Sequence, residues 1–195
     1  MPKDPKRLLK DTTVVDGLCH TLIGDPPPAD PRKDIVDLIL EGGVNVINAT
    51  VILDYYKNDF PTYLKELYKF FVLEEAIPEK LLIVKDSADI ERAKAQGKLG
   101  VILSMQGADA IEHDIRHISI LHKLGVRIIQ ITYNQRNNLG CGAYEPNDTG
   151  LTRFGQQAIL EMNRLGMLVD LSHVGYRTSL DAIEFSRDPA VFSHS

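Results

Sequence analysis

The chain has 195 residues, of which 44% are hydrophobic and 25% charged, and its formal net charge is −5 at pH 7. These values are those of one ordinary globular domain with a core of its own, and they exclude disordered, collagen-like and fibrous classes. No lysine and arginine cluster forms a basic stripe, and no apolar run approaches the roughly 20 residues that span a bilayer, so neither nucleic acid nor membrane is an expected partner. The two cysteines, Cys19 and Cys141, lie far apart in the sequence. Free thiols and a cytoplasmic location are therefore predicted.

Strand-like and helix-like segments alternate along the chain. Apolar runs predict strands at 12–17, 44–51, 81–84, 100–105, 126–133, 167–172 and 190–193. Amphipathic segments predict helices at 30–43, 60–77, 87–98, 113–125, 152–165 and 176–186, with Ser87 as the cap of the third. The sequence leaves open whether 81–84 joins the main sheet. Residues 134–150 predict a long loop, either a lid that faces substrate or a structural excursion.

Repeated strand–helix units with near-continuous apolar strands predict a parallel sheet covered by helices. The two candidate folds are a doubly wound sheet and a (β/α)8 TIM-type barrel. No GxGxxG motif follows the first strand, which argues against a dinucleotide-binding doubly wound sheet. Polar residues cluster just past the C-terminal ends of the strands, where barrel enzymes carry their sites, and about six of the eight barrel strands are present. The sequence therefore predicts a single barrel domain over 1–195 that is incomplete.

Histidines stand at the ends of two consecutive predicted strands, His173 after the fifth barrel strand and His194 after the sixth. Two neutral imidazoles from neighbouring strands suit Zn²⁺ or a similar divalent ion. A third or fourth ligand would come from His20, from Gln106 or from a part of the barrel outside this sequence. Each histidine could instead be an ordinary hydrogen-bonded residue at a strand end. The histidines of the predicted helix 113–125 are interpreted as part of a solvated helix face.

Other strand ends carry polar residues that could assist a reaction. Tyr133 could donate a hydrogen bond to a developing oxyanion, or it could be only an aromatic residue at a strand end. Tyr133 and Asn134 are the candidates for substrate binding. Asp170 could orient a metal ligand through a hydrogen bond or cap a backbone turn, and Asp16 allows the same two interpretations.

The C-terminal part of the chain has the most specific sequence pattern. The stretch EMNRLGMLVDLSHVGYRTSLDAIEFSRDPAVFSHS (161–195) closely resembles the renal, or membrane, dipeptidase family of metallopeptidases, and DLSHV followed by FSHS is a strong marker of that family. Segments 124–142, 147–167 and 88–111 support the resemblance, which covers nearly the whole chain. The resemblance implies a (β/α)8 barrel, a two-zinc site and hydrolysis of dipeptides, including some with a D-residue at the C-terminal side. Members of the family are often homodimers.

The resemblance also implies roles for single positions. His173 and His194 match the two histidine ligands of one zinc. Gln106 falls at the glutamate that bridges the two ions, and Tyr133 falls at the histidine that assists at the carbonyl. The family's catalytic aspartate, and an arginine that holds the substrate carboxylate, would lie past residue 195.

The first strand departs from the family pattern, which reads Asp-Gly-His-Asn-Asp. This chain has DGLCH at 16–20, so Leu18 replaces a histidine ligand and His20 replaces an aspartate ligand. Leu18 has no lone pair, and the neutral amide of Gln106 cannot neutralise two neighbouring dications. One zinc ion is therefore expected rather than two.

Two functions follow from these observations. The first is a metal-dependent, dipeptidase-like hydrolase that cleaves the peptide bond of dipeptides. The alternative is a catalytically impaired barrel that binds a small peptide or metabolite without hydrolysis. A non-metallo enzyme with a changed reaction is ranked below both.

Overall fold

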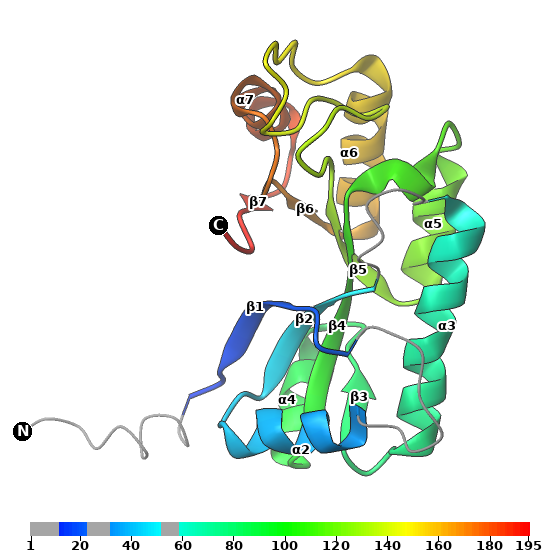
Figure 1. The fold of residues 1–195 in the computed structure, drawn as a ribbon, viewed down its shortest axis with the longest axis vertical. Helices are drawn as coiled ribbons and strands as arrows, with labels where there is room; N and C mark the ends of the chain where they lie inside the picture. The colour runs from blue at the N-terminus through cyan, green and yellow to red at the C-terminus, as the bar shows by residue number, and fades with distance from the viewer. Residues whose placement is uncertain (1–11, 23–31, 52–58) are drawn as a thin grey trace, which may run out of the picture.

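The computed structural model describes residues 12–22, 32–51 and 59–195. Within them the strands are β1 (Val15–Cys19), β2 (Val46–Thr50), β3 (Leu81–Ile83), β4 (Leu99–Gln106), β5 (Val126–Gln130), β6 (Leu168–Asp170) and β7 (Ala190–Val191). The helices are α2 (Arg32–Glu41), α3 (Phe60–Ala76), α4 (Ser87–Ala95), α5 (Arg116–Lys123), α6 (Arg153–Leu165) and α7 (Tyr176–Phe185), with a 3-10 helix η1 (Ala108–Ile111) (Figure 1). The first predicted helix began at residue 30, which lies outside the described residues. No helix of these ranges is both long enough and apolar enough to cross a membrane.

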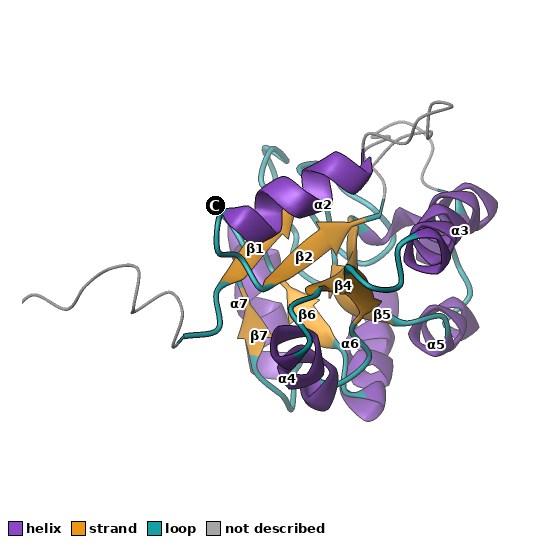
Figure 2. Cartoon of the chain, turned by 90° about the horizontal axis from the view of Figure 1, so that it is seen from below, coloured by secondary structure: helices purple, strands orange, loops and turns teal. Residues whose placement is uncertain are grey.

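All strand pairings are parallel, and the strand order is β1-β2-β4-β5-β6-β7. This order follows the chain without the reversal of a doubly wound sheet, so the barrel-type prediction is confirmed. Seen from below, the strands curve around a common centre and β7 returns towards β1 (Figure 2). The strand at 81–84 does join the sheet, because β3 pairs with the first residues of β4, and β5 pairs with the last ones.

The outer face of the sheet packs against most of the helices. Side chains alternate between the two faces of a strand. On this face Ile47, Leu103, Ile129 and Val169 belong to one apolar core, together with buried residues of α3, α5 and α6. This core holds the sheet in its curved form.

The inner face of the sheet has two halves of different character. In its N-terminal half Leu82, Val84 and Ile102 pack against Ile90 and Ala93 of α4, which closes that end. In its C-terminal half the strands place buried polar side chains instead, namely Asn48, Thr50, Ser104, Gln106, Gln130, Thr132, Asp170 and Ser172. Buried polar groups need partners, so this half is where a site is expected.

Several predicted element ends differ from the observed ones. Asp86, not Ser87, caps α4, because its carboxylate accepts the Asp89 amide at 3.0 Å. The prediction of a helix from 113 was wrong, since α5 begins at Arg116 and His113 therefore precedes it. The 3-10 helix η1 (Ala108–Ile111) precedes α5 in the chain.

Two strand shifts move predicted site residues. β1 covers 15–19 instead of 12–17, so Asp16 and Leu18 lie within the strand. β5 ends at Gln130, so Tyr133 and Asn134 lie in the loop that follows. The strand ends nevertheless point to the same edge of the sheet.

Candidate functional site

One row of side chains crosses the sheet at the C-terminal end of its inner face. Gln106, Gln130 and Asp170 are register partners on β4, β5 and β6. Asp170 is 3% exposed, and its Oδ1 accepts hydrogen bonds from the amides of Ser172 at 2.9 Å and Ser193 at 3.2 Å. These two serines directly precede the two candidate histidines in the sequence. The buried carboxylate therefore anchors both histidine segments.

His173 lies in the turn after β6 with a positive φ of 59°. Its Nδ1 lies 3.0 Å from the side-chain oxygen of Asn134, which itself has a φ of 55°. A carbonyl oxygen can only accept, so Nδ1 donates and the Nε2 lone pair of His173 stays available. Positive φ in non-glycine residues costs free energy and is concentrated at functional sites.

His194 follows β7 and contacts a side chain on each ring nitrogen. Its Nε2 lies 3.1 Å from the amide nitrogen of Gln106, and its Nδ1 lies 2.8 Å from the hydroxyl of Ser193. The amide nitrogen only donates, so Nε2 accepts and Nδ1 has the proton. The rings of His173 and His194 are 4.9 Å apart between centroids, with an angle of 52°.

The surroundings of His173 favour its neutral form. Burial lowers the pKa of His173 below its ordinary value of 6.5, and the nearby His194 lowers it further, while Asp170 acts in the opposite direction. Neutral imidazole is the form that binds metal. His173 is thus held in the protonation state that a metal site needs.

The other predicted site residues fall into two groups. The half-buried Tyr133 lies 4.4 Å from His173 between ring centroids, and Gln106 contacts His194, so both join the pair. His20 is exposed, and Leu18 presents an apolar side chain within β1. Within the described ranges there is no group of three or more His, Cys, Asp or Glu residues that could hold a metal.

β1 nevertheless closes one side of the site. A β-carbon at Gly17 would overlap the carbonyl oxygen of Ser193, so the two main chains are in contact. The Asn48 amide donates to the Gly17 carbonyl at 2.8 Å and holds β1 in place. The ligand positions of β1 are altered, but its backbone still lies beside the segment of His194.

Hydrogen bonds hold the loop at 134–150 in place at two points. Asp148 accepts the Thr178 hydroxyl at 2.7 Å and the Arg177 amide at 2.7 Å, at the start of α7. The Ala143 amide donates to the carbonyl of His173 at 2.9 Å. These contacts favour the structural excursion over a mobile lid, although Asn134 from the same loop reaches the site.

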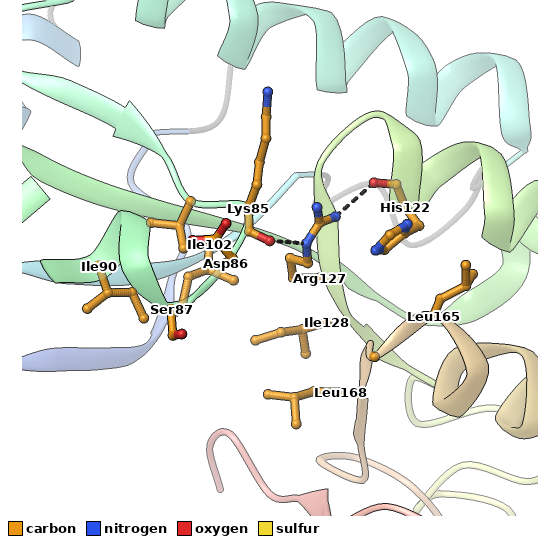
Figure 3. A pocket seen from close by; sticks show the side chains of 12 residues that line it. Lys85, Asp86, Ser87, Ile90, Ile102, His122, Arg127, Ile128, Leu165 and Leu168 are labelled. Atoms are coloured by element: carbon orange, nitrogen blue, oxygen red, sulfur yellow. Dashed lines mark hydrogen bonds between the residues drawn. The ribbon is translucent and has the colours of Figure 1, made fainter. Parts of the chain in front are cut away.

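A cavity of about 330 Å³ lies away from the histidines, where β5 and β6 begin and α4 starts. Ile102, Ile128 and Leu168 form its apolar wall. Figure 3 shows Arg127 beside it, donating to the carbonyl of Lys85 at 2.7 Å and to that of His122 at 2.8 Å. No predicted site residue lines this cavity, so it is separate from the histidine pair.

Comparison with known proteins identifies the family. Residues 4–195 match the family model described as membrane dipeptidase, peptidase family M19. The chain belongs to the membrane dipeptidase family. A Schizosaccharomyces pombe protein described as an uncharacterized dipeptidase is 38% identical over 116 residues, which is 56% of this chain and 28% of that protein.

Solved structures of similar fold extend over nearly all of the chain. An amidohydrolase from Pseudomonas aeruginosa has 34% identity and a TM-score of 0.88, over 98% of this chain and 55% of that one. A metallo peptidase from Rhodobacter sphaeroides, liganded with a phosphinate mimic of the dipeptide L-Ala-D-Ala, has 21% identity and a TM-score of 0.83. It is matched over 94% of this chain and 65% of its own, and at this identity it supports the fold alone. The dipeptidase-family chain therefore spans about half the length of the relatives it matches.

Two functional residues were not assigned a role from the sequence. Ser172 and Ser193 connect Asp170 to the histidine segments. Each serine directly precedes a histidine, in DLSHV and in FSHS. The sequence indication of this role was the repeated Ser-His pair, the first of which begins two residues after Asp170.

The two imidazoles are donors that suit a divalent ion. His173 and His194 present neutral imidazoles whose Nδ1 protons are both taken by oxygens. Histidine ligands of metals show this arrangement, since the bond at the other nitrogen fixes the tautomer. A second ion would need ligands from β1, where Leu18 has none to offer.

Proposed function

We propose that this member of the dipeptidase family is a metal-dependent hydrolase that cleaves the peptide bond of a dipeptide. The observation that carries the proposal is the pair His173 and His194. Both rings are hydrogen-bonded through a protonated Nδ1, so that Nε2 of each ring has no proton. We infer one zinc ion per chain, with Gln106 as a weak additional ligand through its amide oxygen. Zinc at such a site would polarise the scissile carbonyl and lower the pKa of a water molecule.

The chain's own residues would position the substrate. Tyr133 lies beside His173 with the two rings tilted by 31°, and its phenol is proposed to donate a hydrogen bond to the oxygen of the scissile carbonyl. The side-chain oxygen of Asn134 is occupied by His173, so a substrate contact of Asn134 would have to use its amide nitrogen. The buried row beneath the histidines excludes water from one side of the reacting groups.

A second function is favoured by a specific observation. Around the histidine pair Leu18 and Gln106 stand where the family has charged or metal-binding side chains, and His20 is exposed. A site with so little negative charge stabilises a metal-bound state weakly. The alternative is therefore a barrel that binds a small peptide or metabolite and does not hydrolyse it.

The test is metal content together with dipeptide turnover on the same preparation. The protein is purified without chelators, and zinc per chain and release of amino acids from a dipeptide panel are measured. His173→Ala removes one proposed ligand, His20→Ala removes the exposed candidate, and His113→Ala is the matched control for loss of an exposed histidine.

The proposal expects about one zinc per chain in the wild type, retained in H113A and lost in H173A, with turnover that follows the metal. Zinc without turnover would favour the binding function. Absence of zinc from the wild type would overturn the metal site. Homodimer formation and cytoplasmic location stay predictions from the sequence.

A further inference from the structure

We propose that Asp170 is a positioning residue that acts through Ser193 to hold His194 in its Nδ1-protonated tautomer. This inference rests on the proposed function for its purpose, which is to keep Nε2 of His194 unprotonated, so that a metal could bind there in place of the Gln106 amide. Its physical content, the tautomer of one ring, can be measured on the metal-free protein.

The chain of hydrogen bonds has one consistent direction. Ser193 donates its hydroxyl proton to Oδ2 of Asp170, which as a carboxylate only accepts. The Ser193 oxygen is then the acceptor for the Nδ1 proton of His194, 2.8 Å away. Gln106 donates its amide proton to Nε2 of the same ring. The negative charge of Asp170 thus sets the position of a proton on a ring that it does not touch.

The two oxygens of Asp170 have different partners, which makes an isosteric test sharp. Oδ1 accepts three donors, the amide of Ser172 at 2.9 Å, its hydroxyl at 2.7 Å and the amide of Ser193 at 3.2 Å. Two of these are backbone amides and cannot reverse. In Asp170→Asn the remaining oxygen must therefore stay at the Oδ1 position, and the new NH₂ group takes the place of Oδ2.

The new NH₂ donor then reverses the direction of the hydrogen bonds between residue 170, Ser193 and His194. The NH₂ group donates to the Ser193 oxygen, so the hydroxyl proton must turn to another acceptor. Nδ1 of His194 at 2.8 Å is nearer than the hydroxyl of Ser172 at 3.4 Å. Nδ1 would have to lose its proton to accept, and the proton would move to Nε2. The variant is expected to place a proton on Nε2, which in the wild type is unprotonated and accepts the Gln106 amide.

The experiment is ¹⁵N NMR of the histidine side chains in the full 195-residue chain, metal-free and near pH 8. Protonated and unprotonated ring nitrogens have well-separated shifts, and His194→Gln assigns the signals. The wild type should show His194 protonated on Nδ1, and D170N should show it protonated on Nε2. His173 is an internal control, because Asn134 fixes its tautomer and both proteins should give the same signal.

Three further variants separate positioning from general damage. Ser193→Ala should lose the tautomer preference of His194, and Ser193→Thr should retain it because it keeps a hydroxyl. Ser172→Ala removes a hydroxyl that donates to the same carboxylate and accepts the His194 amide at 3.1 Å, but it leaves the path from Asp170 through Ser193 to Nδ1, so the His194 tautomer should not change. These three also carry the test if D170N fails to give a folded circular dichroism spectrum.

The second readout is zinc affinity by competition with a chromophoric chelator. D170N and S193A should bind zinc about 10–100-fold more weakly than the wild type, while S193T should stay close to it. An Nε2 proton on His194 in the wild type, or an unchanged tautomer in a folded D170N and in S193A, would overturn the proposal. A tautomer switch without any zinc binding would support the role of Asp170 and Ser193 in setting the His194 tautomer, and it would overturn the proposed function instead.

Discussion

β1 and β7 end at the same side of the sheet and touch at Gly17 and Ser193, yet the two strand ends are built differently. Behind β7 a buried carboxylate holds a serine hydroxyl, which in turn holds His194. At β1 the exposed Asp16 accepts the amide of Leu18 in the same strand, at 3.0 Å. The comparison teaches that the orientation of His194 depends on an oxygen held behind it, and that nearness of the backbone alone does not fix a side chain.

The largest expected effect comes from making β1 resemble the family pattern. The triple variant Leu18→His, His20→Asp and Gln106→Glu should raise zinc from about one to about two ions per chain, since it adds a lone pair and two carboxylates. Dipeptide turnover should rise by about two orders of magnitude, because a Lewis acid stabilises the transition state by several kcal/mol. Elemental analysis and an amino-acid release assay measure both.

Gln106→Glu alone is the control for this variant and should leave the zinc content near one ion. If the triple variant binds no second ion, the difference between the two strand ends does not lie in these side chains. The hydrogen bonds behind His194 would then be the decisive feature.

Gly17→Ala tests the contact between the two strand ends. The added methyl group would overlap a backbone carbonyl, which cannot move without displacing β7, so we expect a loss of about 1–3 kcal/mol in the free energy of unfolding. Urea denaturation measures it. Gly97→Ala is the matched control, since its β-carbon meets nothing within 4 Å and the cost is backbone strain alone, about 1 kcal/mol. Equal losses in the two variants would show that β1 and β7 are not pressed together in solution.

Gln130→Met examines the row beside Asp170. Gln130 is fully buried, its amide nitrogen donates to the Thr132 carbonyl at 2.6 Å, and its oxygen accepts no hydrogen bond from the described residues. Methionine keeps the shape and removes the unsatisfied acceptor, but it also removes the donor to the Thr132 carbonyl, so the free energy of unfolding should change by less than about 1 kcal/mol. Thermal or urea unfolding measures the change, with Gln106→Met as control. A loss well above about 1 kcal/mol would mean that a donor occupies this oxygen in solution.

Sequence reasoning predicted the fold and the histidine pair because both have local patterns. Apolar runs alternating with amphipathic segments are enough to predict a barrel-type sheet, and histidines at two strand ends must meet at one edge of a parallel sheet. The exposure of His20 could not be predicted, because the direction of a side chain after β1 depends on an irregular register between 16 and 19.

The hydrogen bonds that hold the two histidines could also not be predicted from the sequence. Asp170 allowed two interpretations, and the structure combines them, since its carboxylate accepts backbone amides and reaches His194 through Ser193. Asn134, predicted for substrate, also holds His173, across 39 residues of sequence. Contacts of that separation follow from the folded sheet and leave no periodic mark in the chain.

The smallest expected effect concerns pH. Burial and the neighbouring His194 lower the pKa of His173 below its unfolded value of 6.5, so the folded state takes up its proton later than the unfolded state as pH falls. Folding stability from this group is therefore full above pH 6.5 and decreases as pH falls from 6.5 towards the folded pKa. NMR titration of the metal-free protein should place the His173 midpoint below 6.5, and His173→Gln should flatten the pH dependence of unfolding over that range. A midpoint at or above 6.5 would mean that the attraction of Asp170 outweighs burial, and the carboxylate that orients His194 would then also hold a proton on its neighbour.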